Sequence, residues 1–177
     1  MGWKNVKEHY RIGHIVQVHP KKGICIGSPY IHDLIVVGFG GTVTARYQRE
    51  NDELGRYQQE MLGDMETLRK LVTSPDTFEK SITIWTYDGA DIIEKKCEVP
   101  EWPNVTHDGA MIYENTFSTD RAKVIQWAKE NAEAYLKNSL DALDNARKRL
   151  SDCELRVAKA RCHIDRLNSL TTSTDSG

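Results

Sequence analysis

The sequence lacks any long hydrophobic run, since no stretch approaches the roughly 20 apolar residues of a membrane-spanning helix. Its first residues, MGWKNVKEHYRIGH, have no apolar core of the kind that secretory signal peptides carry. Cysteine is sparse too, and Cys25, Cys97, Cys153 and Cys162 stand singly, without a CxxC pair. We therefore expect a cytoplasmic protein with free thiols and no association with a membrane.

The sequence also has no strong excess of charge of either sign. A net charge of −2 and a pI near 6.3 give no general attraction to nucleic acid or to acidic lipid surfaces. The charge is unevenly spread, because residues 51–117 carry 14 acidic and 6 basic side chains. This acidic stretch suits a basic partner surface, although an ordinary solvated face explains it more simply.

Residues 10–47 show the two-residue alternation of β-strands, for example in Ile12, His14, Val16 and Val18. The uninterrupted apolar run 34–37 predicts a strand that is covered on both faces. Gly38-Phe39-Gly40-Gly41 invites comparison with a phosphate-binding loop, but such loops are followed by a helix and we expect a strand here. We therefore predict a hairpin turn.

The period changes to three and four residues after Asn51, which predicts one amphipathic helix over about residues 52–73. Residues 81–87 alternate again, and Asp88-Gly89 predicts the turn of a hairpin. Residues 111–113 are expected to form a last strand. The prediction for residues 1–117 is thus a small antiparallel β-rich domain with one helix, within an α+β fold.

The segment from Ser118 to Leu170 contains no glycine and no proline, which predicts a long C-terminal helix. Apolar and small residues recur along it every seven residues in two interleaved series, the a/d pattern of a coiled coil. The expected oligomerisation residues are Ala132, Leu136, Leu143, Ala146, Leu150, Val157, Ala160, Ile164 and Leu167. Ser139 and Cys153 occupy the remaining positions of the second series.

The second series is mostly small, which lets a partner helix approach closely and favours antiparallel packing. Ser151 and Glu154 also form a capping-box pattern that can begin a new helix after a turn. Two geometries therefore remain open over residues 118–170: one continuous helix, or a helical hairpin bent near Ser151. Residues 171–177 are small and polar, and we expect a disordered tail. The stripe needs cover from water, and a second copy of the chain is the simplest cover.

Two loops are the expected binding surfaces. Tyr30, His32 and Asp33 share the loop 28–33, and polar and aromatic side chains on a loop held by a sheet often bind ligands. Trp102 stands between two prolines in the loop 100–108, together with His107, and is the expected exposed contact residue. Trp85, in a strand, is expected in the core.

An enzyme is the weaker alternative, a small hydrolase using His32 and Asp33 with His14 or His19. The sequence has no HxH, HExxH or CxxC spacing and no serine nucleophile elbow, so we expect no metal, no cofactor and no covalent catalysis. The basic residues of the last helix alternate with acidic ones, which is typical of solvated coiled-coil flanks rather than of a nucleic-acid-binding face. A nucleotide or other small ligand bound where subunits meet stays open as an alternative.

The organisation, a compact β-rich domain followed by a charged coil, resembles accessory proteins of bacteriophages and mobile elements. That resemblance implies binding and inhibition of a host protein, or sequestration of a small signal molecule. The functional hypothesis is a non-enzymatic interaction protein: the last helix joins copies of the chain, and the β-rich domain binds another protein.

Overall fold

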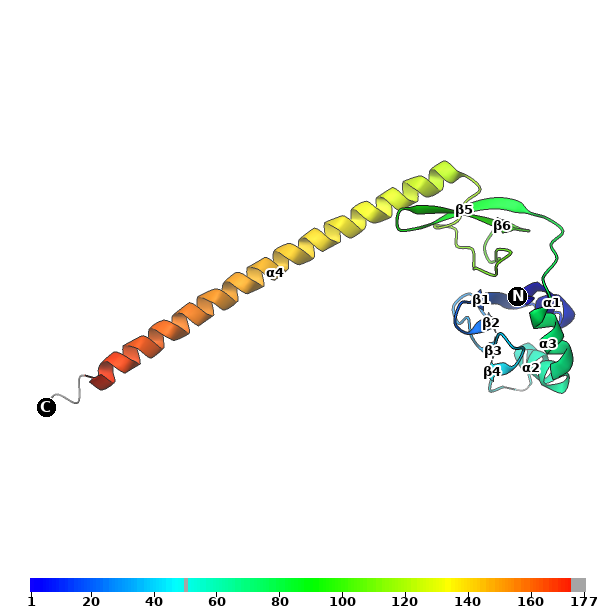
Figure 1. Ribbon diagram of the computed structural model, residues 1–177, viewed down its shortest axis with the longest axis horizontal. Coiled ribbons are helices and arrows are strands. Elements are labelled where there is room, and N and C mark those ends of the chain that lie inside the picture. The colour runs from blue at the N-terminus through cyan, green and yellow to red at the C-terminus, as the bar shows by residue number, and fades with distance from the viewer. Residues whose placement is uncertain (50, 173–177) are drawn as a thin grey trace. The chain divides into compact units, whose positions relative to one another are not determined.

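The computed structural model describes residues 1–49 and 51–172, and its fold is α+β as predicted (Figure 1). Antiparallel strands and three short helices come first, and one long helix follows. The chain divides into two compact units, Met1–Lys129 and Glu130–Gly177. The first unit holds every strand among the described residues.

The first sheet has four antiparallel strands in the order β1-β2-β3-β4. Their bounds are Ile15–His19 for β1, Gly23–Gly27 for β2, Ile35–Val37 for β3 and Val43–Ala45 for β4. Every residue of β2 and β3 is buried, as the apolar run 34–37 predicts for β3. The loop 38–41 is the predicted hairpin turn, in which Gly41 adopts a φ of 73° and leaves no room for a Cβ beside Arg69.

Three helices accompany this sheet: α1 (Trp3–His9), α2 (Glu53–Gly63) and α3 (Met65–Thr73). The prediction of one helix over 52–73 is wrong, because the helical conformation is interrupted at Asp64. Asp64 ends α2 with a φ of −139° and caps α3, accepting the N–H of Thr67 at 2.9 Å. Apolar residues of both helices still face one core, which is why the periodicity runs through the break. Helix α1 follows from no pattern that we recognised in the sequence.

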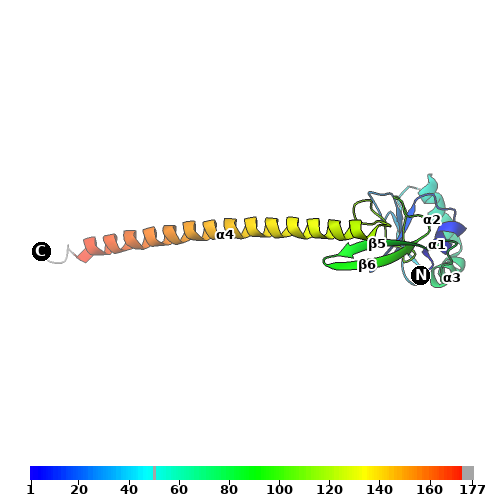
Figure 2. The same cartoon turned by 90° about the horizontal axis from the view of Figure 1, so that it is seen from above.

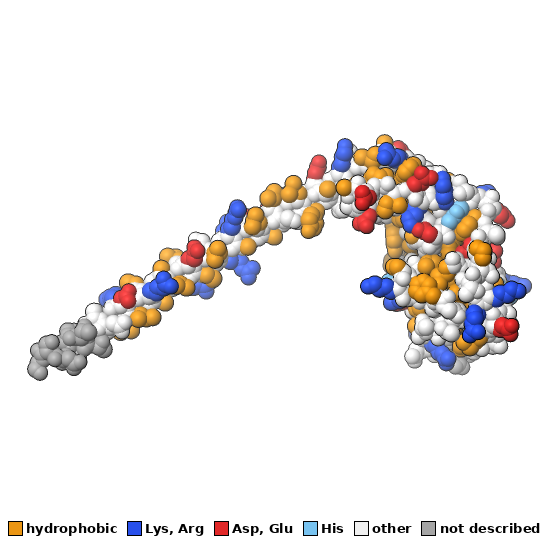
Figure 3. Space-filling model, in the orientation of Figure 1, with side chains coloured by type: hydrophobic (Ala, Val, Ile, Leu, Met, Phe, Trp, Pro, Cys, Tyr) orange, Lys and Arg blue, Asp and Glu red, His pale blue; other side chains and the backbone are white. Residues whose placement is uncertain are grey.

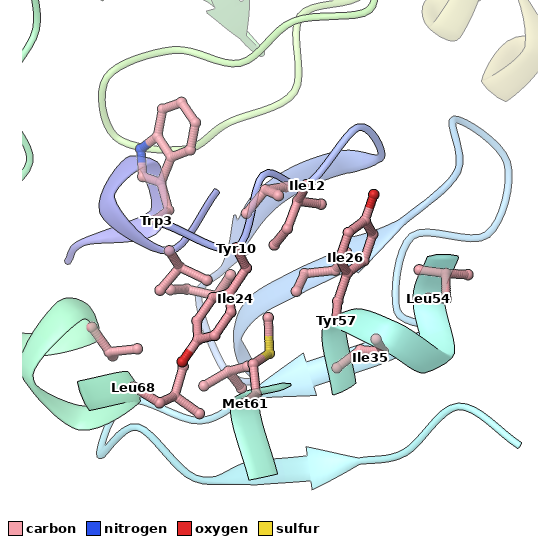
Figure 4. Packing of buried hydrophobic residues seen from close by; sticks show 14 residues of the cluster. Trp3, Tyr10, Ile12, Ile24, Ile26, Ile35, Leu54, Tyr57, Met61 and Leu68 are labelled. Carbon is pink, nitrogen blue, oxygen red and sulfur yellow. The ribbon is translucent and has the colours of Figure 1, made fainter. Parts of the chain in front are cut away.

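The main core lies between the four-stranded sheet and these helices (Figure 4). Ile24, Ile26 and Ile35 of the sheet meet Tyr57, Met61 and Leu68 of α2 and α3, and all of these are fully or almost fully buried. Trp3 and Tyr10 complete this core from α1 and from the residue that follows it. Buried apolar surface therefore determines which face each short helix presents.

A second sheet consists of β5 (Ile82–Asp88) and β6 (Asp91–Cys97), joined at the predicted Asp88-Gly89 turn. Ile84 and Cys97 form a small core with Ile112. Trp85 is only half-buried, with the guanidinium of Arg121 5.4 Å from its ring centre, so its assignment to the core is wrong. Residues 111–113 do not form the expected strand, since Met111 makes only an isolated bridge to Val105.

Helix α4 (Arg121–Thr172) is one uninterrupted helix of 52 residues, about 78 Å long at 1.5 Å per residue (Figure 2). Asp120 caps its start by accepting the N–H of Ala122 at 2.8 Å. The helix runs through Ser151, so the continuous geometry is the one observed and the bent hairpin is not. Of the predicted tail, residues 171 and 172 belong to α4, and residues 173–177 lie outside the described part of the chain.

Candidate functional site

The first candidate site is the apolar stripe of α4, which we call the α4 seam. It comprises Ala132, Leu136, Ser139, Leu143, Ala146, Leu150, Cys153, Val157, Ala160, Ile164 and Leu167. Hydrophobic side chains recur along this helix in the space-filling view (Figure 3). Every described side chain from residue 130 to residue 169 is exposed in the single chain, including Leu150 at 60% and Leu167 at 63%.

The seam differs from the scattered apolar residues of ordinary surfaces because it is continuous. Its members are spaced alternately three and four residues apart over five heptads, so they lie on one side of α4. Leu155, 71% exposed, stands outside this pattern and serves as an internal comparison. Contiguous apolar surface of this kind marks a protein interface.

Charged side chains border the seam. Asp144 and Lys148 form an ion pair at 2.9 Å along the helix. Arg147 and Glu154 lie on one flank of the seam, and Arg149 and Arg156 lie on the other. The four flanking charges come within reach of a helix that packs on the seam, whereas Asp144 and Lys148 lie on the opposite, solvated side of α4.

The second candidate site is an aromatic depression in the unit Met1–Lys129. Tyr30, Trp102 and Tyr113 line a hollow of about 500 Å³ together with Pro29 and Glu114. Tyr30 is 87% exposed, and the other two aromatic residues are 38% exposed. The structure thus brings together one residue from each of the two loops predicted to bind a partner. The sequence does not indicate Tyr113 as a binding residue, because the strand predicted at 111–113 does not show whether its side chain is exposed.

The predicted pair His32 and Asp33 lies in a different depression, beside Lys22, Cys25 and Tyr30. His32 Nε2 donates to the carbonyl of Pro29 at 2.8 Å, and Lys22 Nζ donates to Asp33 Oδ2 at 2.6 Å. The hydrogen bond from Lys22 holds the pKa of Asp33 below its usual value. Asp33 therefore orients a lysine rather than the imidazole, and the arrangement that the hydrolase hypothesis requires is not formed.

The remaining histidines named by the sequence lie apart. His14 is half-buried with Nδ1 3.8 Å from Glu53 Oε2, and its ring meets Tyr57 edge-on. His19 Nδ1 accepts the N–H of Lys21 at 3.1 Å, which closes the turn after β1. His107 stacks on Phe78 with ring centres 3.8 Å apart, so it does not join Tyr30 and Trp102. Within residues 1–49 and 51–172, no three His, Cys, Asp or Glu side chains gather as metal ligands.

Among the helices that the structure describes, none combines the length and the apolar character required to cross a membrane. The chain matches no protein family model, no curated protein and no solved structure, so no function is carried over to it from another protein.

Proposed function

We propose that this protein is a self-associating interaction protein, in which the α4 seam joins two copies of the chain. The observation that carries the proposal is the exposure of a continuous heptad stripe along residues 132–167. No described side chain in residues 130–169 is buried, so packing within one chain does not stabilise this part of α4. Helices in water owe most of their stability to packing of an apolar face, and a second copy supplies it.

The sizes of the seam residues favour an antiparallel pair of helices. In a parallel pair, like meets like, so large layers such as Leu143 with Leu143 alternate with layers of two small residues that leave space unfilled. In an antiparallel pair centred between Leu150 and Cys153, the four central layers each join a large residue to a small one, whereas Leu136 meets Leu167 in an outer layer. Leu143 then faces Ala160, and Val157 faces Ala146. These central layers have similar volumes and allow the close approach that small residues permit.

The flanking charges do not choose between the two orientations. The antiparallel pair brings Arg147 to Glu154 on one flank and Arg149 to Arg156 on the other, so attraction and repulsion offset each other. The parallel pair brings Arg149 to Glu154 and Arg156 to Arg161, with the same balance. Side-chain size is therefore the deciding feature.

Engineered disulfides test the pairing directly. In a chain with Cys153→Ser and Cys162→Ser, the double variant Leu143→Cys, Ala160→Cys should form a covalent dimer under mild oxidation, because the antiparallel layers put these positions opposite each other. The two positions are about 25 Å apart along one helix at 1.5 Å per residue, so they cannot link within a chain. Each single variant is the control. A dimer from Leu143→Cys alone would show parallel pairing, and no crosslink in any variant would refute the seam as the interface.

The second part of the proposal is that the aromatic depression binds another protein. Tyr30, Trp102 and Tyr113 supply large, rigid side chains in exposed positions, and such residues contribute most of the binding energy at protein interfaces. This agrees with the resemblance to bacteriophage accessory proteins, which implies inhibition of a host protein. The free thiols Cys25 and Cys97 suit the reducing interior of a cell.

Affinity capture from a bacterial lysate tests this part, with Trp102→Ala compared with the wild-type chain. The variant should lose the captured protein and keep its thermal stability, because Trp102 belongs to neither core cluster. Phe39→Ala, at an exposed aromatic residue elsewhere, is the control and should keep the captured protein. Equal capture by the wild-type chain and Trp102→Ala would refute the role of the depression.

A further inference from the structure

A cavity of about 330 Å³ lies in the unit Met1–Lys129, between α1 and the chain segment 98–107. Its apolar walls come from Trp3, Ile12, Phe78, Val99 and Val105. This volume is at the lower end of the range for pockets that bind small molecules. The cavity shares no lining residue with the aromatic depression, and the α4 seam takes no part in it.

The charges around the cavity are predominantly basic. Lys4, Lys7 and Arg11 line it on the side of α1, against two carboxylates. Lys4 is already paired, since its Nζ lies 2.8 Å from Glu98 Oε1 and 3.5 Å from Glu8 Oε1. One lysine therefore contacts both carboxylates, and two cationic side chains remain.

Lys7 is the first of these two. Its side chain is partly buried, and among the described residues it forms no ion pair or hydrogen bond. Burial lowers the pKa of Lys7, because the ammonium group loses water, and the attraction of the Glu8 carboxylate only partly offsets this. A partly buried charge that no hydrogen bond satisfies is costly to the fold, and an anion placed beside it would reduce that cost.

Arg11 is the second. It adopts a φ of 49°, the left-handed region that glycine occupies readily and other residues rarely do. It holds the position after the end of α1 where glycine is preferred, with the N–H of Ile12 bonded to the carbonyl of Lys7 at 2.9 Å. Residues held in this backbone conformation cluster at functional sites, and Arg11 is one of the residues that line the cavity.

We propose that this cavity binds a small organic anion, whose apolar body lies against Phe78 and Val105 while its acidic group contacts Lys7 and Arg11. The class comprises carboxylates and phosphate esters that carry a ring or a short hydrocarbon chain. The apolar body of the ligand contacts the apolar walls of the cavity, and the two cationic side chains select an acidic group with a negative charge. This proposal does not depend on the self-association of the chain, since the site lies within one unit of one chain.

Titration of the full-length protein with 8-anilinonaphthalene-1-sulfonate tests the site, because this aromatic anion fluoresces in apolar surroundings. Lys7→Met keeps the aliphatic stem and removes the charge, and it should weaken binding by about tenfold or more, the usual loss for a hydrogen bond to a charged group. Lys70→Met, at an exposed lysine of α3, is the control and should bind as the wild-type chain does. The uncharged probe N-phenyl-1-naphthylamine should bind equally well to all three proteins.

Arg11→Gly provides a second measurement that does not depend on the folding of the lysine variant. It should weaken binding of the anionic probe and raise the melting temperature, because glycine relieves the left-handed backbone. Benzoate and phenyl phosphate as competitors then distinguish a carboxylate ligand from a phosphate ester. The proposal is overturned if the anionic probe does not bind, or if both Lys7→Met and Arg11→Gly bind it with wild-type affinity.

Discussion

The substitution Leu150→Glu should break self-association, and its magnitude follows from the exposure of this side chain. Burial of a whole leucine is worth about 1.5–3 kcal/mol, and Leu150 has 60% of its surface left to bury. Loss of both leucines from a dimer thus removes about 2–4 kcal/mol of association free energy, which corresponds to a roughly 30- to 700-fold higher dissociation constant. A carboxylate placed in the interface adds to this loss.

Sedimentation equilibrium over nanomolar to micromolar concentrations measures the effect. Leu155→Glu is the matched control, because it makes the same chemical change five residues away on the same helix but outside the α4 seam. It should associate as the wild-type chain does. If the two variants dissociate to the same extent, or if neither changes the dissociation constant, the assignment of the interface to the seam is wrong.

Three further predictions concern the unit Met1–Lys129. Burial alone would raise the pKa of Asp108, but hydrogen bonds from Lys95 and Thr106 lower it. The Asp108 carboxylate therefore stabilises the fold above its unfolded pKa of about 3.9, and this stabilisation is lost as the pH falls through the folded pKa. Asp108→Asn should therefore lower the melting temperature at pH 7 and much less at a pH below the folded pKa of Asp108, and an equal loss at both would contradict this. The pKa of Asp76 shifts in the opposite direction, because burial raises it and the Oδ2 atom has no partner among the described atoms. The stabilising effect of this carboxyl group is lost as the pH rises through its folded pKa. Asp76→Asn should therefore raise the melting temperature at pH 7 but not in acid. Leu68→Ala empties a fully buried site and should cost about 2–5 kcal/mol in urea unfolding, while association through the seam persists at low urea; a loss below 1 kcal/mol would contradict the packing seen here.

Much of the fold was predictable where a local pattern coincides with what the tertiary structure requires. Asp88-Gly89 places a hairpin turn correctly, because Gly89 takes the positive φ of 58° that such turns need. The covered strand predicted at 34–37 is observed as the buried β3, Ile35–Val37, and the glycine turn after it is likewise confirmed. The break between α2 and α3 was not predicted, since Asp64 serves as the end of one helix and the cap of the next without interrupting the apolar periodicity.

The candidate sites divide in the same way. The α4 seam is a property of spacing on one helix, so the sequence names its residues, and their pairing with a second copy stays a prediction. The aromatic depression needs Tyr30, Trp102 and Tyr113 to come together from distant segments, and only two of them were chosen from the sequence. The cavity beside Lys7 was not foreseen at all, because its walls combine α1 with residues about 70 to 100 positions later in the chain.

The sequence by itself determined the α+β class, the hairpins and the long C-terminal helix with its stripe, because each depends on residues that are neighbours along the chain. The tertiary structure alone decided that Asp33 pairs with Lys22 and not with His32, that α1 closes the core, and that Lys7 and Arg11 border an apolar cavity. These features depend on contacts between segments remote in sequence, whose distances no local pattern encodes.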